Sequence, residues 1–360
     1  MKGSVVKSLL AGSICILLLI SGCKSKEGQP SSASSGMRLT GAGSSFVYPI
    51  MGRWIADFQQ SNPDAQINYQ SIGSGGGIQQ LKQGLVDFAA SDATLSDDQL
   101  KDMPPLIQVP ESAGPVCITY NLPSLKEPLR LSPTVLAGIF LGTIKDWQDR
   151  AIAKDNPGVS LPKLSILVAH RSEGSGTTNI FTTYLDEVSP DWHKKVGRGL
   201  SVSWPAGLAG KGSEGVTGVV KQSPGGIGYV ELTYASQNNL PTALIANKAG
   251  KWIAPSAEST SAAIAAFGNE LGQDVRAPIV NPPASAAEAY PISGLTFLLI
   301  PKAAKDPAKA LGLQKFVQYV ITSGQDRSSQ MHYAPLPASL QQLDQQLMAQ
   351  VGTKGGALAQ

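Results

Sequence analysis

The chain has 360 residues, of which 42% are hydrophobic and 15% are charged, and it carries a net charge of +3. This length allows two domains of ordinary size, each with a sizeable core. Lys2 and Lys7 lie in the first 22 residues, which contain no acidic residue, so the rest of the chain has a net charge of only +1. So balanced a charge argues against nucleic acid as a partner, because that binding needs a strongly basic surface.

The N-terminus has the features of a secretory signal. Two lysines supply its positive charge, and the apolar run over residues 9–20 is short for a membrane-spanning helix. The next residues, Ile20-Ser21-Gly22-Cys23, resemble the bacterial lipobox, in which cleavage precedes a cysteine that receives lipid. An uncleaved membrane anchor is the alternative, and the small residues before the cysteine argue against it. We therefore predict a lipoprotein signal peptide over residues 1–22 and a lipid anchor on Cys23, which tethers the protein to a membrane without spanning it.

Cysteine usage argues against disulfide and metal chemistry. Cys15 leaves with the signal and Cys23 is acylated, so Cys117 is the remaining thiol. A single thiol forms neither an internal disulfide nor a multi-cysteine metal site, and we expect Cys117 to be a buried structural residue. We predict no cofactor and no metal site. Residues 23–38, rich in Ser, Gly and Lys, are expected to form a flexible linker, and residues 351–360 a flexible tail.

The folded body alternates apolar strands with amphipathic helices. The first series comprises a strand entering a Gly-Ser turn (38–46), a helix (47–60), a strand (65–73), a helix (78–85) and strands at 86–92, 105–111 and 114–121. The second series comprises a helix (132–142), a strand (163–171), helices at 177–188 and 214–223, a strand (225–232), a helix (256–271), a strand (294–301) and helices at 306–322 and 337–351. This alternation predicts an α/β architecture with a largely parallel sheet.

Two connections, at residues 119–124 and 290–295, are candidate crossings between lobes. They predict a discontinuous lobe I, formed by residues 39–119 and 292–350, and a lobe II over residues 120–291. Ligands of open α/β sheets bind beyond the carboxyl ends of strands, and paired lobes close on a ligand by a hinge motion. We therefore expect a ligand cleft between the two lobes.

Three Gly/Ser loops share one local pattern, in which a strand leads through small polar residues into a helix. They are GAGSSF (41–46), SIGSGGG (71–77) and RSEGSGTT (171–178). Such loops present unpaired backbone N–H groups at a helix N-terminus, which attracts anions, and glycine allows a close approach of the backbone. For a single loop, an ordinary capped turn is the more probable interpretation. Three loops in one chain can converge, and together they indicate an anion site.

Two charged residues sharpen this interpretation. The guanidinium of Arg171 can pair with two oxyanion oxygens, and Glu173 can fix its position, although such a pair can also be a surface ion pair of little energy. Asp92 ends a predicted strand, where aspartate is commonly a turn cap. Beside a bound anion its carboxylate would repel the anion, unless the anion carries a proton. Hydrogen phosphate carries one and sulfate at neutral pH does not, so Asp92 would select phosphate.

Four motifs together resemble one protein family. TGAGSSF (40–46), YQSIGSGGGIQQL (69–81), VDFAASDATLSDDQL (86–100) and RSEGSGTTNIF (171–181) are similar to segments of the phosphate-binding protein of bacterial phosphate ABC transporters, in the same order. The resemblance runs from about residue 39 to about residue 338. It implies a two-lobed periplasmic-binding-protein fold with two hinge crossovers.

The resemblance also implies the ligand contacts. The positions that match the family's phosphate contacts are Ser45, the backbone N–H of Phe46, Ser74, Asp92 as acceptor of the phosphate proton, Arg171, Ser175, Gly176 and Thr177. Glu173 stands where the family often has aspartate, so the sequence leaves the bracing of Arg171 open.

The function implied is non-catalytic. We expect a lipid-anchored, extracytoplasmic protein that binds inorganic phosphate and delivers it to a membrane-embedded permease with a cytoplasmic ATPase. A tethered phosphate sensor, a surface adhesin or a receptor for another oxyanion are alternatives on the same fold. A secreted phosphatase or serine hydrolase is the enzymatic alternative. The sequence contains neither a G-x-S-x-G motif nor a two-metal set of His and Asp to support this alternative. A P-loop ATPase is excluded because the sequence has no G-x-x-x-x-G-K-[ST] loop.

Overall fold

The computed structural model describes residues 37–304 and 306–353. The predicted signal peptide, Cys23 and the linker up to residue 36 lie outside these residues, as do residues 354–360 of the predicted tail. No helix within the described ranges combines the length and the apolar character that crossing a membrane requires.

An eight-stranded sheet runs through the fold in the order β2-β1-β3-β11-β4-β8-β6-β7. Its strands are β1 (Arg38–Gly43), β2 (Gln66–Ser71), β3 (Phe88–Ser91), β4 (Leu106–Tyr120), β6 (Leu167–Arg171), β7 (Leu208–Gly210), β8 (Gly226–Glu231) and β11 (Ser293–Pro301). Two parallel groups, β2-β1-β3 and β8-β6-β7, are joined by β11 and β4, which pair antiparallel with each other and with their outer neighbours. The sheet is therefore mixed, and the expectation of a largely parallel sheet is wrong. Antiparallel pairing arises because β4 and β11 carry the chain in opposite directions through the centre.

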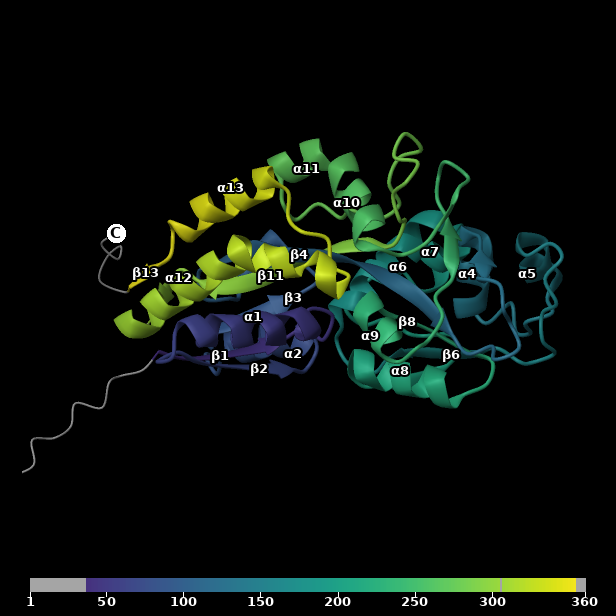
Figure 1. Cartoon of the computed structure of the whole chain (residues 1–360), viewed down its shortest axis with the longest axis horizontal. Coiled ribbons are helices and arrows are strands. Elements are labelled where there is room, and N and C mark those ends of the chain that lie inside the picture. Colours follow the sequence, from purple (N-terminus) through teal and green to yellow (C-terminus); the bar gives the residue numbers. More distant parts are fainter. Residues whose placement is uncertain (1–36, 305, 354–360) are drawn as a thin grey trace, which may run out of the picture. The chain divides into compact units, whose positions relative to one another are not determined.

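One long strand replaces the two strands predicted at 105–111 and 114–121. Pro110, Gly114 and Pro115 suggested a break there, yet β4 continues through 15 residues (Figure 1). The pairing register shifts between Thr296 and Phe297 of β11, so Glu111 forms a bulge in the ladder. A bulge accommodates a proline that cannot donate a ladder hydrogen bond. β4 pairs with β11 as far as Pro115 and with β8 from Val116, so this single strand links the two halves of the sheet.

Helices flank the sheet and lead back into it. They are α1 (Tyr48–Ser61), α2 (Ser74–Lys82), α3 (Asp97–Lys101), α4 (Pro133–Phe140), α5 (Arg150–Asp155), α6 (Gly176–Val188), α7 (Pro190–Lys195), α8 (Gly212–Gln222), α9 (Leu232–Gln237), α10 (Ala257–Ala266), α11 (Gly268–Gln273), α12 (Pro307–Ile321) and α13 (Ala338–Met348), with 3₁₀ helices η1 (Ser323–Arg327) and η2 (Ser329–Met331). Most of the longer helices agree with the predictions within a few residues, but the helix predicted at 256–271 is interrupted at Phe267 and forms α10 and α11. The predicted helix 78–85 begins earlier, at Ser74, so the Gly-rich segment of the second loop forms its first turn.

Two small sheets complete the described structure. One contains β5 (Arg130–Leu131), β9 (Leu244–Ala246) and β10 (Trp252–Ile253), and the other contains β12 (Ala303–Ala304) and β13 (Gly352–Thr353). The second sheet corrects the expectation of a flexible tail from residue 351. Val351 is buried and its carbonyl accepts a hydrogen bond from Gln314 Nε2 at 2.8 Å, so order extends at least through β13.

Large aromatic side chains fill the core and satisfy their polar atoms. Trp54, Trp147 and Trp192 are fully buried, and each donates its indole N–H to a backbone carbonyl at 2.7–3.0 Å. Cys117 is a free, buried thiol on β4, as expected.

Candidate functional site

Four polar loops converge where strands of the large sheet end and helices begin. Three of them are the predicted loops, which follow β1, β2 and β6. The fourth was not predicted: it joins β7 to α8, whose first turn contains Ser213. Ser45 Oγ lies 3.0 Å from Ser213 Oγ and accepts a hydrogen bond from Ser213 N at 3.2 Å. The first and fourth loops therefore touch directly.

The second and third loops are joined by the hydroxyl of Ser74 and by the backbone. Ser74 Oγ accepts hydrogen bonds from Asp92 N at 3.2 Å and from Gly176 N at 3.1 Å. The N–H of Gly75 donates to the carbonyl of Gly174 at 2.9 Å. Because the Ser74 hydroxyl accepts in both of its bonds, it retains its own proton to donate to a ligand.

Gly176 has to be glycine because the loops approach so closely. A Cβ atom at this position would meet Ser74 Oγ at 2.5 Å and Asp92 Oδ2 at 2.6 Å. These separations are far below van der Waals contact, so any side chain at position 176 would push the third loop away from Asp92. The N-terminus of α6 therefore sits directly against the carboxylate.

Asp92 lies at the centre of this cluster and is 4% exposed. Its Oδ1 accepts a hydrogen bond of 2.5 Å from Ser44 Oγ. Burial raises the pKa of Asp92 from 3.8 to about 6, against the hydrogen bond from Ser44 and the positive charge of Arg171, both of which lower it. The carboxylate is thus destabilised by its surroundings and would gain from a partner that shares a proton with it.

Arg171 brings the positive charge of the cluster and is also 4% exposed. Its Nη1 donates to Thr177 Oγ1 at 3.1 Å and to Ser213 Oγ at 3.4 Å, which places one edge of the guanidinium among the hydroxyls of the third and fourth loops. Its Nε donates to Glu173 Oε1 at 2.7 Å, and Nη2 donates to the same oxygen. One edge of Arg171 is therefore braced and the other faces the polar cluster.

Glu173 braces Arg171 and is itself held by α8. The N–H of Gly212 donates to both carboxylate oxygens of Glu173 at 3.2 Å. Burial on its own raises the pKa of Glu173, but the charge and hydrogen bonds of Arg171 and the Gly212 N–H outweigh it and lower the pKa. Glu173 is therefore ionised at neutral pH. This answers the question that the sequence left open about the bracing of Arg171.

The remaining predicted residues lie in the same cluster with specific partners. Ser175 is buried and caps α6, since its Oγ accepts from Thr178 N at 3.1 Å. Phe46 is buried, and its N–H donates to Ser44 Oγ at 2.9 Å. The structure thus brings Ser45, Phe46, Ser74, Asp92, Arg171, Ser175, Gly176 and Thr177 together.

Ser44 and Ser213 are the residues of the cluster that sequence reasoning missed. Ser44 adjoins Ser45, and the family resemblance pointed to Ser45 as the contact of this loop. Ser213 lies in the first turn of α8, just after a strand of only three residues, LAG at 208–210. The segment AGKGSEG has the strand–loop–helix pattern of the other loops, which was a usable signal although a short one.

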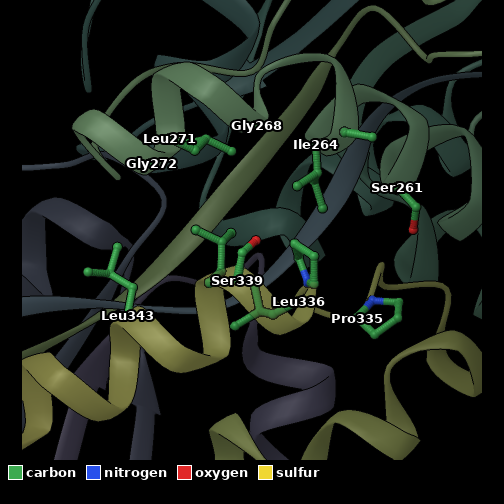
Figure 2. A pocket seen from close by; sticks show the side chains of 12 residues that line it. Ser261, Ile264, Gly268, Leu271, Gly272, Pro335, Leu336, Ser339 and Leu343 are labelled. Carbon is green, nitrogen blue, oxygen red and sulfur yellow. The ribbon is translucent and has the colours of Figure 1, made fainter.

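An apolar pocket lies elsewhere, between α10, α11, α13 and the segment that leads into α13 (Figure 2). Its volume is about 450 Å³, and Ile264, Leu271, Leu336 and Leu343 are among the side chains that line it. No charged residue lines the pocket. It therefore does not suit an anion and is separate from the polar cluster.

Sequence comparison confirms the resemblance. A family model described as the PBP superfamily domain matches residues 27–323. The phosphate-binding protein PstS of Xylella fastidiosa (strain Temecula1) is 42% identical over 344 residues, covering 91% of this chain and 93% of the relative. The phosphate-binding protein PstS of Methanocaldococcus jannaschii is 37% identical and covers 93% of this chain and 92% of its own length. These relatives are named as binding proteins and not as enzymes.

Comparison of structures identifies the fold. A high affinity periplasmic phosphate-binding protein with bound phosphate, PfluDING, matches with a TM-score of 0.69 and 22% identity, over 85% of this chain and 92% of that protein. A phosphate binding protein from Stenotrophomonas maltophilia matches with a TM-score of 0.64 and 20% identity, over 85% of this chain and 92% of its own. The mixed α/β structure with its eight-stranded sheet is thus the periplasmic-binding-protein fold.

Proposed function

Since this chain belongs to the family of PstS phosphate-binding proteins, we propose that it binds inorganic phosphate outside the cytoplasm and delivers it to an ABC permease. The observation that carries the proposal is the position of Asp92, a buried acceptor among donors from four loops. A site made only of donors would accept any oxyanion. The buried carboxylate adds a requirement for a proton on the ligand.

Hydrogen phosphate can pair both with the hydrogen-bond donors of this site and with its buried acceptor, Asp92. Its unprotonated oxygens can accept from Arg171, from the loop hydroxyls and from N–H groups at helix N-termini. Its proton can be donated to Asp92, whose pKa of about 6 keeps the carboxylate available as an acceptor at neutral pH. Sulfate has no proton at this pH, so it would place unprotonated oxygens against a buried carboxylate. The residues proposed to bind phosphate are Ser45, Phe46, Ser74, Asp92, Arg171, Ser175, Gly176 and Thr177, with Ser213 as an addition.

The proposed lobes, residues 39–119 with 292–350 and residues 120–291, meet at this cluster. The contacts of Ser45 with Ser213 and of Gly75 with Gly174 both join a residue of lobe I to a residue of lobe II. Because these contacts bury Asp92 and Arg171, a ligand reaches the site when the lobes separate. β4, which pairs with β11 of lobe I and with β8 of lobe II, forms the proposed hinge together with residues 290–295, which lead into β11.

The first prediction is tight 1:1 binding of phosphate by the chain from Met37 onward, which contains every described residue. Isothermal titration calorimetry at pH 8 with phosphate and with sulfate measures it. We expect binding of phosphate and at least about 100-fold weaker binding of sulfate, the ratio expected for an unpaired buried charge. No binding of phosphate would contradict the proposed function, and equal affinities would contradict the role of Asp92.

The enzymatic alternative is tested on the same preparation. A secreted phosphatase would release phosphate steadily from a model phosphate ester such as p-nitrophenyl phosphate, whereas a binding protein releases none above background. A tethered sensor or adhesin would also bind phosphate, so binding alone does not distinguish these roles from transport. Uptake of labelled phosphate is therefore compared in cells that have the gene and in cells that lack it. Loss of high-affinity uptake supports transport, and unchanged uptake supports the other roles.

We also propose that the protein is anchored through lipid on Cys23 after removal of residues 1–22. Replacing Cys23 by serine removes the acceptor thiol, and we predict that the protein then moves from the membrane fraction to the soluble fraction and loses incorporation of labelled palmitate. A Cys117→Ser variant is the matched control, because that thiol is buried within the fold. Equal labelling of wild type and Cys23→Ser would contradict the anchor.

A further inference from the structure

Three tyrosine hydroxyls hold three successive backbone carbonyls of the first loop. Tyr69 donates to Ser44 O at 2.9 Å, Tyr234 donates to Ser45 O at 2.6 Å, and Tyr333 donates to Phe46 O at 2.6 Å. The tyrosines come from β2, from α9 and from the segment after η2. Three distant parts of the chain therefore fix consecutive peptide groups of one loop.

The tyrosine rings are themselves held in place. Tyr69 is 8% exposed, and its ring stacks with those of Tyr48 and Phe88 at centroid separations of 6.2 Å. Tyr333 is fully buried, and its ring meets that of Phe46 edge-on at 6.1 Å. Tyr234 is 6% exposed. Buried rings with few free rotamers can aim a hydroxyl at a fixed point.

Fixing a carbonyl also fixes the N–H of the following residue, because the peptide group is planar and its N–H and C=O point in opposite directions. The N–H groups of Phe46 and Val47 are directed at Ser44 Oγ, at 2.9 and 3.5 Å. That hydroxyl is the one that donates to Asp92 Oδ1. The N–H groups of the loop therefore face the side of Asp92, and its carbonyl groups face the three tyrosines.

We propose that Tyr69, Tyr234 and Tyr333 are positioning residues, which orient the N–H groups of residues 45–47 toward the anion without touching it. This inference rests on the proposed phosphate site. The carbonyls would otherwise be buried acceptors without donors, and a peptide that rotated to satisfy them would turn acceptor oxygens toward a negatively charged ligand.

Glu231 supports the role of Tyr333. Its Oε2 lies 3.1 Å from the Tyr333 hydroxyl and accepts from Thr233 N at 2.9 Å. A tyrosine hydroxyl has one proton, so when Tyr333 donates to Phe46 O, the contact with Glu231 is favourable only if that carboxyl carries a proton. Burial raises the pKa of Glu231 to about 8, which keeps it protonated at neutral pH. The neutral carboxyl thus leaves the Tyr333 proton to the loop.

Tyr234 differs from the other two because it belongs to the proposed lobe II, whereas Ser45 belongs to lobe I. Its hydrogen bond therefore forms only when the lobes meet, and it orders the loop at the moment of closure. Tyr69 and Tyr333 both belong to lobe I and order the loop independently of closure.

The test compares Tyr69→Phe, Tyr234→Phe and Tyr333→Phe with a matched control, Tyr290→Phe. Tyr290 is fully buried and donates to the carbonyl of Val116 at 3.2 Å, outside the loop. Each of the four changes removes one hydroxyl and keeps the ring. We expect the three loop variants to bind phosphate about three- to ten-fold more weakly, as for the loss of one hydrogen bond, and the control to bind as the wild type does. Thermal unfolding of all four variants shows whether a loss of phosphate affinity merely accompanies a general loss of stability.

A second readout needs no ligand. The amide resonances of residues 45–47 in phosphate-free protein should shift in the Tyr69 and Tyr333 variants and stay unchanged in Tyr290→Phe. Equal phosphate affinity in the wild type and all three loop variants would overturn the inference. Absence of phosphate binding by the wild type would overturn the proposed function instead, while the amide shifts would still report whether the tyrosines orient the loop.

Discussion

Asp92→Asn is expected to bind sulfate at least about 100-fold more tightly than the wild type does, with a smaller change in phosphate affinity. The asparagine has no charge to repel sulfate, and its amide N–H₂ can donate to an oxygen that the carboxylate rejects. Competitive calorimetry with both anions measures the change. A variant that keeps the wild-type preference for phosphate would show that selectivity arises elsewhere.

The same substitution should stabilise the phosphate-free protein near pH 8. The folded pKa of Asp92, about 6, lies above its value of 3.8 in the unfolded chain, so the protein loses stability as the pH rises from about 4 to about 6, and the full cost remains above pH 6. The cost is about 3 kcal/mol at most, and it disappears as the pH falls below the unfolded value. Urea unfolding at pH 8 should therefore show the variant as more stable, and the advantage should nearly vanish at about pH 3, below the unfolded pKa.

Asp344→Asn is the matched control for these two effects. Asp344 is buried on α13, neither of its carboxylate oxygens has a hydrogen-bond partner among the described residues, and burial raises its pKa to about 8. Its replacement should also stabilise the protein at high pH, while selectivity between phosphate and sulfate stays as in the wild type. The pair of variants thus separates the loss of a buried charge from the loss of the site's acceptor.

Arg171→Ala should weaken phosphate binding by about 10- to 100-fold, the range for hydrogen bonds to charged groups. Part of this loss comes from Glu173, whose carboxylate would then stand near the anion with the Gly212 N–H and the Ser172 hydroxyl as its remaining donors. Removing Glu173 as well should restore some affinity. Glu173→Gln, which keeps an acceptor for Arg171 and Gly212, should change affinity little.

Calorimetry on the two single alanine variants and on the double variant completes a double-mutant cycle. We expect the double variant, Arg171→Ala with Glu173→Ala, to bind phosphate more tightly than Arg171→Ala alone. If it binds more weakly, Glu173 contributes to binding by a route other than bracing Arg171. If Arg171→Ala binds as well as the wild type, the guanidinium has no part in the site.

Local patterns predicted the parts of this protein that depend on neighbouring residues. The helices α1, α6 and α12 follow from apolar periodicity, and the loops at 41–46, 71–77 and 171–178 follow from glycine and serine between a strand and a helix. The family resemblance, which the comparisons confirm, also rests on these short motifs. The sequence analysis allowed these loops to converge, because ligands of open α/β sheets bind beyond the carboxyl ends of strands. The loop after β6 belongs to a different parallel group from the loops after β1 and β2, so the meeting of all three depends on the antiparallel strands β4 and β11 between the groups.

The features that the sequence did not predict depend on contacts between distant residues. β4 continues through Pro110 and Pro115 because β11 and β8 pair with it on both sides of the bulge. Ser213 joins the cluster through Ser45, which lies 168 positions earlier in the chain. Tyr234 and Tyr333 reach the first loop from parts of the chain far from it. No local sequence pattern predicts these contacts, because the residues that neighbour a serine or tyrosine in sequence do not specify which distant residue it contacts.

A crystal structure of the protein grown with phosphate tests the central claim most directly. We predict one phosphate among the four loops, with one oxygen within about 2.7 Å of the Asp92 carboxylate, as for a charge-assisted O–H···O bond, and others within hydrogen-bond distance of Arg171. Phosphate bound away from Asp92, or a cluster that takes up no phosphate at saturating concentration, would contradict the account.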